Sequence, residues 1–311
     1  MSGLIISRLG IMLLMMTCLS IVVFYLVNLQ PNLEKLAKEQ ANNRMTEEQV
    51  QSWLESNGYK RPISQRYVEW LGAVSRGDLG YSTRFRKNVS DVLPARLGYT
   101  GLLAFWVMIT MVPTALLLGI LAGMREGSRS DRVLSSLSIM TTATPEYVSG
   151  IIFTVIFSSW LGWLKGVSKA GDITFANFAL PVMTMAIYGL GYIARITRAS
   201  MAEVMNKQYI RTARLKGLPF HLIVIRHALR NALIAPFTVI MLQFPWLLTG
   251  VVIVEKLFNY KGFGWLLVEA AENNDIDLLL SCSLVSVAVV VVTQLIADIG
   301  YVLLNPRIRV K

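Results

Sequence analysis

Residues 97–124 read LGYTGLLAFWVMITMVPTALLLGILAGM, and no charged side chain occurs in this interval between Arg96 and Arg125. About 20 consecutive apolar residues are enough for a helix to cross the hydrocarbon core of a bilayer. An uninterrupted apolar run of this length is the main sequence signal of a transmembrane helix, so this stretch decides the class of fold.

Five further stretches have the same character. They are residues 9–27, the interval from Arg132 to Lys165 that Glu146 interrupts, and the intervals Asp172 to Arg195, Arg230 to Glu255 and Asp277 to Asp298. A cleaved signal peptide is an alternative for the first stretch, but its length and the lack of an A-x-A site favour an uncleaved helix. The sequence therefore predicts an all-α protein, a polytopic bundle of six transmembrane helices.

The composition agrees with a membrane protein. The 311 residues are 54% hydrophobic and 16% charged, with a mean hydropathy of +0.52, which is too apolar for an ordinary soluble domain of this size. The net charge of +11 is typical of cytoplasmic loops held against anionic lipid. No dense run of Lys and Arg is interleaved with aromatic residues, so we expect membrane lipid, and no nucleic acid, among the partners.

The distribution of Lys and Arg predicts the orientation. With the N-terminus inside, the short cytoplasmic segments hold fifteen basic residues, and the short outer loops hold four, which are Lys165, Lys169, Lys256 and Lys261. The positive-inside bias therefore places both termini in the cytoplasm.

The predicted organisation has four parts. Residues 1–30 contain the first transmembrane helix, 31–96 form an extracytoplasmic segment, 97–305 form a core of five transmembrane helices, and 306–311 are a cytoplasmic tail. Within the extracytoplasmic segment, a capped and weakly amphipathic helix is predicted from Thr46, Glu47 and Glu48, followed by Val50, Trp53 and Leu54.

The loop 199–231, between the fourth and fifth apolar stretches, contains the most informative motif, YIRTARLKGLP at 209–219. Its residues up to Lys216 favour helix, Gly217 suits the left-handed position after a helix end, and Pro219 suits the first turn of the next helix. The loop is expected to form two helices that meet at an elbow. The second helix is expected to present apolar side chains to the cytoplasm, namely Phe220, Leu222, Ile223 and Ile225.

Two interpretations of this elbow are about equally supported by composition. In one, the helix lies on the inner leaflet and its basic side chains reach the lipid head groups. In the other, a partner protein buries the apolar face. Along this loop a helix is followed by a glycine turn, then by a proline and a second helix. This order favours docking to a protein.

Residue types needed for catalysis or metal binding are scarce. The two cysteines, Cys18 and Cys282, lie in apolar stretches, and the two histidines, His221 and His227, share one polar loop. We expect no disulfide, no metal site, no cofactor-binding site and no catalytic residue. No G-x-x-x-x-G-K-[ST] phosphate loop occurs in the sequence, so we do not expect this chain to bind or hydrolyse ATP.

Glu146 and Gln243 are candidates for a translocation pathway. An ionisable group in an apolar stretch costs roughly 2.5–3.5 kcal/mol at the bilayer centre and commonly serves function. The alternative for Glu146 is a structural role beside a helix irregularity at Thr144 and Pro145. Gln243 and Pro245 either mark a kinked stretch that faces the pathway, or Gln243 is a buried polar residue that joins helices.

The run from Tyr209 to Asn231 resembles the cytoplasmic docking motif of permeases in the dipeptide/oligopeptide/nickel family of ABC importers. The general importer pattern is Glu-Ala-Ala, three residues, then Gly. Here Arg211, Thr212 and Ala213 precede Gly217, and Arg-Thr-Ala-Arg is common in the peptide branch. Further segments resemble the family in the same order, namely GYKRP at 58–62, QRYVEWL at 65–71, GDLGYS at 77–82, EKLFNYKGFG at 255–264 with Ala270 and Asp275, and LNPRI at 304–308.

Two departures from the family pattern occur. Asn305 stands where the usual Asp-Pro-Arg ending has Asp, and a Pro-Gly-Asp-Pro element after the first helix is reduced to Gln30, Pro31 and Asn32.

The resemblance implies the type I ABC importer permease fold, with 199–231 as a cytoplasmic coupling loop. The residues implied in ATPase coupling are Arg211, Thr212, Ala213, Arg214, Lys216, Gly217, Leu218, Pro219, His227, Arg230 and Asn231. The implied partners are a paralogous permease subunit, two cytoplasmic ABC ATPase subunits that use the ATP, and an extracytoplasmic solute-binding protein. The implied function is translocation of peptides or a related small solute across a bacterial inner membrane.

A secondary transporter of small solutes is the alternative that the hydropathy also permits. Such a transporter predicts inverted repeats and ionisable residues near the bilayer midplane, and only Glu146 fits. A membrane-embedded enzyme needs a constellation of catalytic side chains, which two histidines in one loop do not supply. The sequence favours the importer permease over both.

Overall fold

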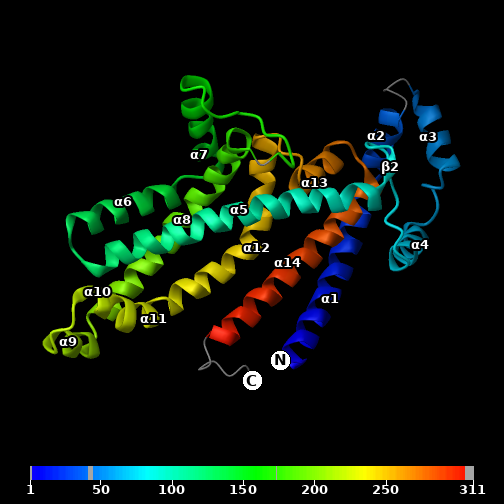
Figure 1. Cartoon of the computed structure of the whole chain (residues 1–311). Coiled ribbons are helices and arrows are strands. Elements are labelled where there is room, and N and C mark those ends of the chain that lie inside the picture. Colours follow the sequence, from blue (N-terminus) through cyan, green and yellow to red (C-terminus); the bar gives the residue numbers. More distant parts are fainter. Residues whose placement is uncertain (1, 41–44, 173, 305–311) are drawn as a thin grey trace. The chain divides into compact units, whose positions relative to one another are not determined.

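The computed structural model describes residues 2–40, 45–172 and 174–304. The described elements are almost all helices (Figure 1). They belong to two compact units. The first unit comprises Met1–Thr100 and Lys261–Val292, and the second comprises Gly101–Tyr260 and Thr293–Lys311. The predicted tail, 306–311, lies outside the described residues.

The described helices account for the six predicted apolar stretches. Four are long and apolar enough to cross a membrane, and they are α1 (Ser2–Val27), α5 (Val89–Met124), α8 (Phe175–Met205) and α14 (Ile276–Leu304). If each of two bent pairs of helical segments is one span, the number of candidate spans rises to six. One pair is α6 (Arg129–Ala143) with residues 146–160, and the other is residues 220–232 with the first part of α12 (Ile234–Leu257). The predicted all-α class is confirmed.

The third apolar stretch is broken. Between α6 and the segment that starts with α7 (Glu146–Phe153) the chain bends by 105°. It leaves the helical conformation at Thr144 and Pro145, where ψ is 123° and 143°. Proline has no amide hydrogen and disfavours a helical conformation in the residue before it. The predicted irregularity is confirmed, and a π-helical segment, η1 (Thr154–Trp160), follows α7.

The first unit contains the short elements that follow α1. They are α2 (Gln30–Gln40), α3 (Glu47–Ser56), α4 (Ile63–Ser75), the antiparallel strands β1 (Tyr81–Ser82) and β2 (Lys87–Asn88), and α13 (Phe263–Glu272). At the start of α3, Thr46 Oγ1 accepts from the Gln49 amide, and Gln49 Oε1 accepts from the Thr46 amide. Because Val50 and Leu54 are buried on one side of α3, the predicted capped and amphipathic helix is confirmed.

The second unit is built around α8, which contacts α6, α7 and α12. A Cβ atom added to Gly191 of α8 would lie 2.0 Å from Thr141 Oγ1 and 2.7 Å from the Ser138 carbonyl of α6. This absence of a side chain allows α6 and α8 to pack closely. Four short elements are grouped at the C-terminal end of α8 (Figure 1), namely α9 (Gln208–Leu215), α10 (Phe220–Leu222), the π-helical segment η2 (Ile223–Ala228) and α11 (Leu229–Ala232).

Candidate functional site

The two halves of the predicted elbow meet at a Schellman turn. The Leu218 amide donates to the Ala213 carbonyl at 3.3 Å. The Gly217 amide donates to the Arg214 carbonyl at 3.0 Å. This pair of bonds needs a residue with positive φ after the helix end, and Gly217 has a φ of +74°. The predicted left-handed glycine is confirmed, and Pro219 is the N-cap of α10, so the second helix begins where the sequence predicts it.

The elbow has an apolar core of its own, which continues into the C-terminal end of α8. The buried members of this elbow core are Met201, Val204, Met205, Ile210, Ala213, Ile223, Val224, Ala228 and Ala232. Close-packed interiors deform little under load. The elbow and the end of α8 are therefore expected to move together.

The core contains Ala213, which the family resemblance implies in ATPase coupling, and Ile223, which is expected from the sequence to face the cytoplasm. Ala213 is 5% exposed and Ile223 is 1% exposed. The expectation that Ile223 faces the cytoplasm is wrong, because Ile223 packs in the elbow core with apolar residues of α8 and α9. Neither side chain is available to a partner in this conformation.

The outer surface of the elbow carries apolar side chains among basic ones. We call four exposed apolar residues the elbow tip, and they are Leu215 (82% exposed), Leu218 (37%), Phe220 (42%) and Ile225 (61%). The exposed basic residues of the elbow include Arg211, Arg214, Lys216 and Arg226. An exposed apolar patch bordered by polar residues is typical of a protein interaction site. The arrangement suits a partner cleft that is apolar at its base and acidic at its rim.

The remaining predicted coupling residues lie on the second half of the elbow or near its turn. Of these, His227 is half-buried, and Thr212, Pro219, Arg230 and Asn231 are exposed. Asn231 Nδ2 donates to the Tyr209 hydroxyl at 3.1 Å, which joins the end of the elbow to the start of α9. At the N-cap of α9, Lys207 forms an ion pair with Glu203 at 2.7 Å, and the hydrogen bond to that carboxylate raises the pKa of Lys207.

The two pathway candidates lie on helices that contact each other. Glu146 is the first residue of α7, and its Oε2 atom is buried without a hydrogen-bond partner among the described residues. Gln243 is 6% exposed and lies in α12, which contacts α7. Pro245 lies inside α12, which continues past it.

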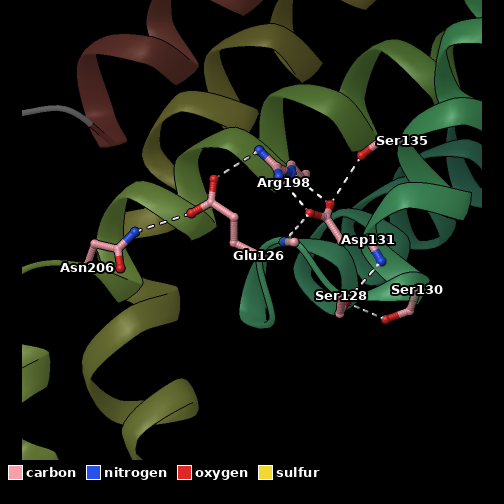
Figure 2. A network of polar contacts seen from close by, with 8 residues as sticks. Glu126, Ser128, Ser130, Asp131, Ser135, Arg198 and Asn206 are labelled. Atoms are coloured by element: carbon pink, nitrogen blue, oxygen red, sulfur yellow. Dashed lines mark hydrogen bonds and ion pairs between the residues drawn. The ribbon is translucent and has the colours of Figure 1, made fainter.

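A polar cluster at the start of α6 is a feature that the sequence reasoning missed. Figure 2 shows Asp131 of α6 between Arg198 of α8 and Ser135, with Glu126 and Asn206 on the far side of Arg198. Arg198 donates from Nε and Nη2 to the two carboxylate oxygens of Asp131 at 2.8 and 2.7 Å. Ser128 followed by Asp131 is a recognisable helix-start pattern, but nothing in the sequence indicates that Arg198 is its partner.

Comparisons with known proteins point to one class of molecule. Residues 115–310 match the family described as binding-protein-dependent transport system inner membrane component. This match includes the elbow, Glu146, Gln243 and the Asp131 cluster.

Relatives of known name agree along most of the chain. A putative peptide permease protein of Brucella ovis is 31% identical over 97% of this chain and 98% of its own length. The oligopeptide transport system permease protein AppB of Bacillus subtilis is 33% identical over 83% of this chain and 84% of its own length. The glutathione transport system permease protein GsiC of Escherichia coli is 32% identical over 82% of each chain.

A solved structure has a similar fold. A chain in a crystal structure of an amino acid ABC transporter with histidines superimposes with a TM-score of 0.52, at 15% identity. The match covers 75% of this chain and 97% of the other.

Proposed function

The chain belongs to the family of binding-protein-dependent transport system inner membrane components, and from this premise we propose that it translocates peptides or closely related small solutes, driven by an ATPase that grips its elbow. The chain is a permease subunit of an ABC importer and resides in a membrane. Membership of this family also implies ATPase subunits and a solute-binding protein as partners, and it disfavours the secondary transporter.

The elbow is the surface proposed to dock into the ATPase. Leu215 and Ile225 of the elbow tip are 82% and 61% exposed, and neither belongs to the elbow core. Both side chains are therefore free to pack against a partner. Burying an aliphatic side chain of this size stabilises a complex by roughly 1.5–3 kcal/mol. Reversing a 1:99 ratio of two transporter conformations to 99:1 needs about 5.5 kcal/mol. If a few tip residues are buried by the ATPase in one of its states and exposed in another, the difference in binding free energy between the two states is of that order.

The finer arrangement of the importer is proposed from the family resemblance and the charge distribution. We infer that the elbow and both termini lie in the cytoplasm, with two ATPase subunits beneath them. A paralogous permease is the second membrane subunit. ATP hydrolysis occurs in the ATPase subunits, and this chain needs no cofactor of its own.

Peptides are proposed as the cargo because relatives that match over most of their length carry peptide, oligopeptide or glutathione in their names. The separate binding protein is expected to make the selection among them. Glu146 and Gln243 are proposed to face the pathway, since both are partly or fully buried polar groups on helices that contact each other.

The decisive test of energy coupling compares two energy sources. Cells that express the complete importer are depleted of ATP while the proton gradient is kept intact, and uptake of radiolabelled trialanine is measured. Uptake should stop. Uptake that follows the proton gradient instead would overturn the proposal.

A second test locates the elbow. A single cysteine at Leu215 should react with a maleimide only after the inner face of the membrane is opened, and it should crosslink to a co-purified ATPase subunit. A cysteine at Ser56, exposed in the segment after α1, serves as the outer control. Labelling of position 215 from outside, or no crosslink to an ATPase, would contradict the proposed role of the elbow.

A further inference from the structure

Asp131 and Arg198 form a paired contact between α6 and α8. The guanidinium of Arg198 uses Nε and Nη2 to reach both carboxylate oxygens, at 2.8 and 2.7 Å. The Asp131 side chain is 4% exposed and that of Arg198 is 28% exposed. Two parallel bonds between planar groups fix orientation as well as distance. The contact therefore holds the two helices in one axial register.

Asp131 is also fixed to the backbone at the start of α6. Its Oδ2 accepts from the Gly127 amide at 2.8 Å, and its Oδ1 accepts from the Ser135 hydroxyl at 3.2 Å. Its own amide donates to Ser128 Oγ, which caps α6. With two bonds on each oxygen, the carboxylate has little freedom to move without the first turn of α6.

Arg198 lies beside the elbow core. It is three residues before Met201, which is fully buried in that core. The Ser200 hydroxyl donates to the Ala232 carbonyl at 2.8 Å, which fixes the same turn of α8 to α11. A displacement of the elbow therefore reaches Arg198 through packed and hydrogen-bonded groups.

The far end of α6 leads directly into the broken span. α6 ends at Ala143, the bend of 105° follows, and Glu146 begins α7. The close contact between α6 and α8 at Gly191 is steric, and such a contact limits how closely the helices approach but supplies no directional bond along their axes. The ion pair is thus the described contact that most directly resists sliding of α6 along α8.

From this geometry we propose that the Asp131–Arg198 pair is a positioning element, which transmits the ATP-driven displacement of the elbow to α6 and to the bend at residues 144–145. The inference rests on the proposed function of the elbow. It assigns to the two residues a role in coupling, without contact to the solute or to ATP.

The test compares conservative variants in the complete importer. Arg198→Lys keeps the charge and removes the paired geometry, and Asp131→Asn keeps the shape and removes the charge. Glu126→Gln is the matched control, since Glu126 lies 3.6 Å from the same guanidinium but is 51% exposed. Assembly with the partner subunits, ATP hydrolysis and uptake of radiolabelled trialanine are measured for each variant.

The ratio of trialanine taken up to ATP hydrolysed separates a positioning role from a structural one. We expect the Arg198→Lys and Asp131→Asn variants to assemble and to hydrolyse ATP. The ratio of trialanine taken up to ATP hydrolysed should fall about tenfold or more, because loss of a hydrogen bond between charged groups has an effect of that size. Glu126→Gln should keep the wild-type ratio. The double variant should be no worse than either single variant, because both remove one contact.

A second readout does not depend on the solute. In a background with Cys18→Ser and Cys282→Ala, a single cysteine at Thr144 reports maleimide reactivity at the bend with and without ATP and vanadate. Nucleotide trapping should change the reactivity in the parent protein and leave it unchanged with Arg198→Lys. A wild-type response and a wild-type ratio in Arg198→Lys would overturn the inference.

Failure to assemble in both single variants would assign the pair to folding, and this result also overturns the inference. Failure of the proposed function looks different. In that case the parent importer itself shows no ATP-dependent uptake, or its elbow shows no crosslink to the ATPase.

Discussion

Ser82 donates its hydroxyl hydrogen to Asp275 Oδ2 at 2.5 Å, across 193 positions of the sequence. Both residues are fully buried. The same oxygen of Asp275 accepts from the Arg84 amide at 3.1 Å, and its other oxygen accepts from the Leu278 amide at 3.4 Å. Asp275 therefore fastens the hairpin of β1 and β2 to the start of α14 within the first unit.

Replacing these two residues is predicted to destabilise the first unit unequally. Ser82→Ala removes two hydrogen bonds, the one donated to Asp275 and the one accepted from the Phe85 amide, whereas Asp275→Asn neutralises a buried carboxylate that accepts three. Bonds to charged groups contribute about 1.5–3 kcal/mol each, and buried donors left unpaired add to the loss. Thermal unfolding of the detergent-purified protein should show a larger decrease in midpoint for Asp275→Asn. Equal midpoints for the two variants would contradict this account.

Gly217→Val is predicted to uncouple transport while leaving membrane insertion intact. A Cβ atom at this position meets nothing within 4 Å, so the effect arises from the φ of +74° and not from a clash. A left-handed conformation costs an L-residue roughly 1–2 kcal/mol, and most for a β-branched one. ATP-dependent uptake of trialanine should fall with Val. Asn tolerates this conformation, so Gly217→Asn should retain most of the uptake, and normal uptake by Gly217→Val would refute the prediction.

Gly191→Ala is predicted to push α6 away from α8. The added Cβ would overlap Thr141 Oγ1 and the Ser138 carbonyl, and overpacking of this kind costs about 1–3 kcal/mol. Gly98→Ala in α5 is the matched control, because a Cβ there meets no atom within 4 Å. The control should be neutral or stabilising by about 0.5–1 kcal/mol, since Ala favours helix. The thermal midpoints of the two variants should move apart, and a shared shift would argue against close packing at Gly191.

Glu146→Gln is predicted to lower uptake without lowering stability. One carboxylate oxygen is buried without a hydrogen bond among the described residues, and Gln places a neutral amide of the same shape there, so no loss of stability is expected. If Glu146 meets the amino terminus of the cargo, uptake of trialanine should fall several-fold, while Glu203→Gln, at an exposed site, changes little. A normal rate and a normal substrate profile in Glu146→Gln would eliminate the pathway role.

Much of the fold follows from local features of the sequence. The six membrane-spanning stretches are predicted from the length of their apolar runs. A helix needs such a run to cross the lipid whatever its tertiary contacts are. Pro145 and Gly217 predict a break and a turn, because their backbone restrictions act within one or two residues. The cap at Thr46 is equally local.

The missed features depend on contacts between distant residues. Arg198 is one of eight basic residues between Arg195 and Arg230, and nothing in the sequence distinguishes it as the partner of Asp131. The burial of Ile223 depends on packing with residues of α8 and α9, and its own segment does not predict that contact. The roles of the coupling residues and of Gln243 stay predictions. The coupling residues are proposed to act on partner subunits, and the translocation pathway is proposed to be completed by a second permease subunit.

The exposed elbow tip has a consequence for the life of the subunit. On the proposed docking, a copy made in excess of its ATPases would leave Leu215 and Ile225 uncovered, so the side chains proposed to receive force from the ATPase would also distinguish unassembled copies from assembled ones.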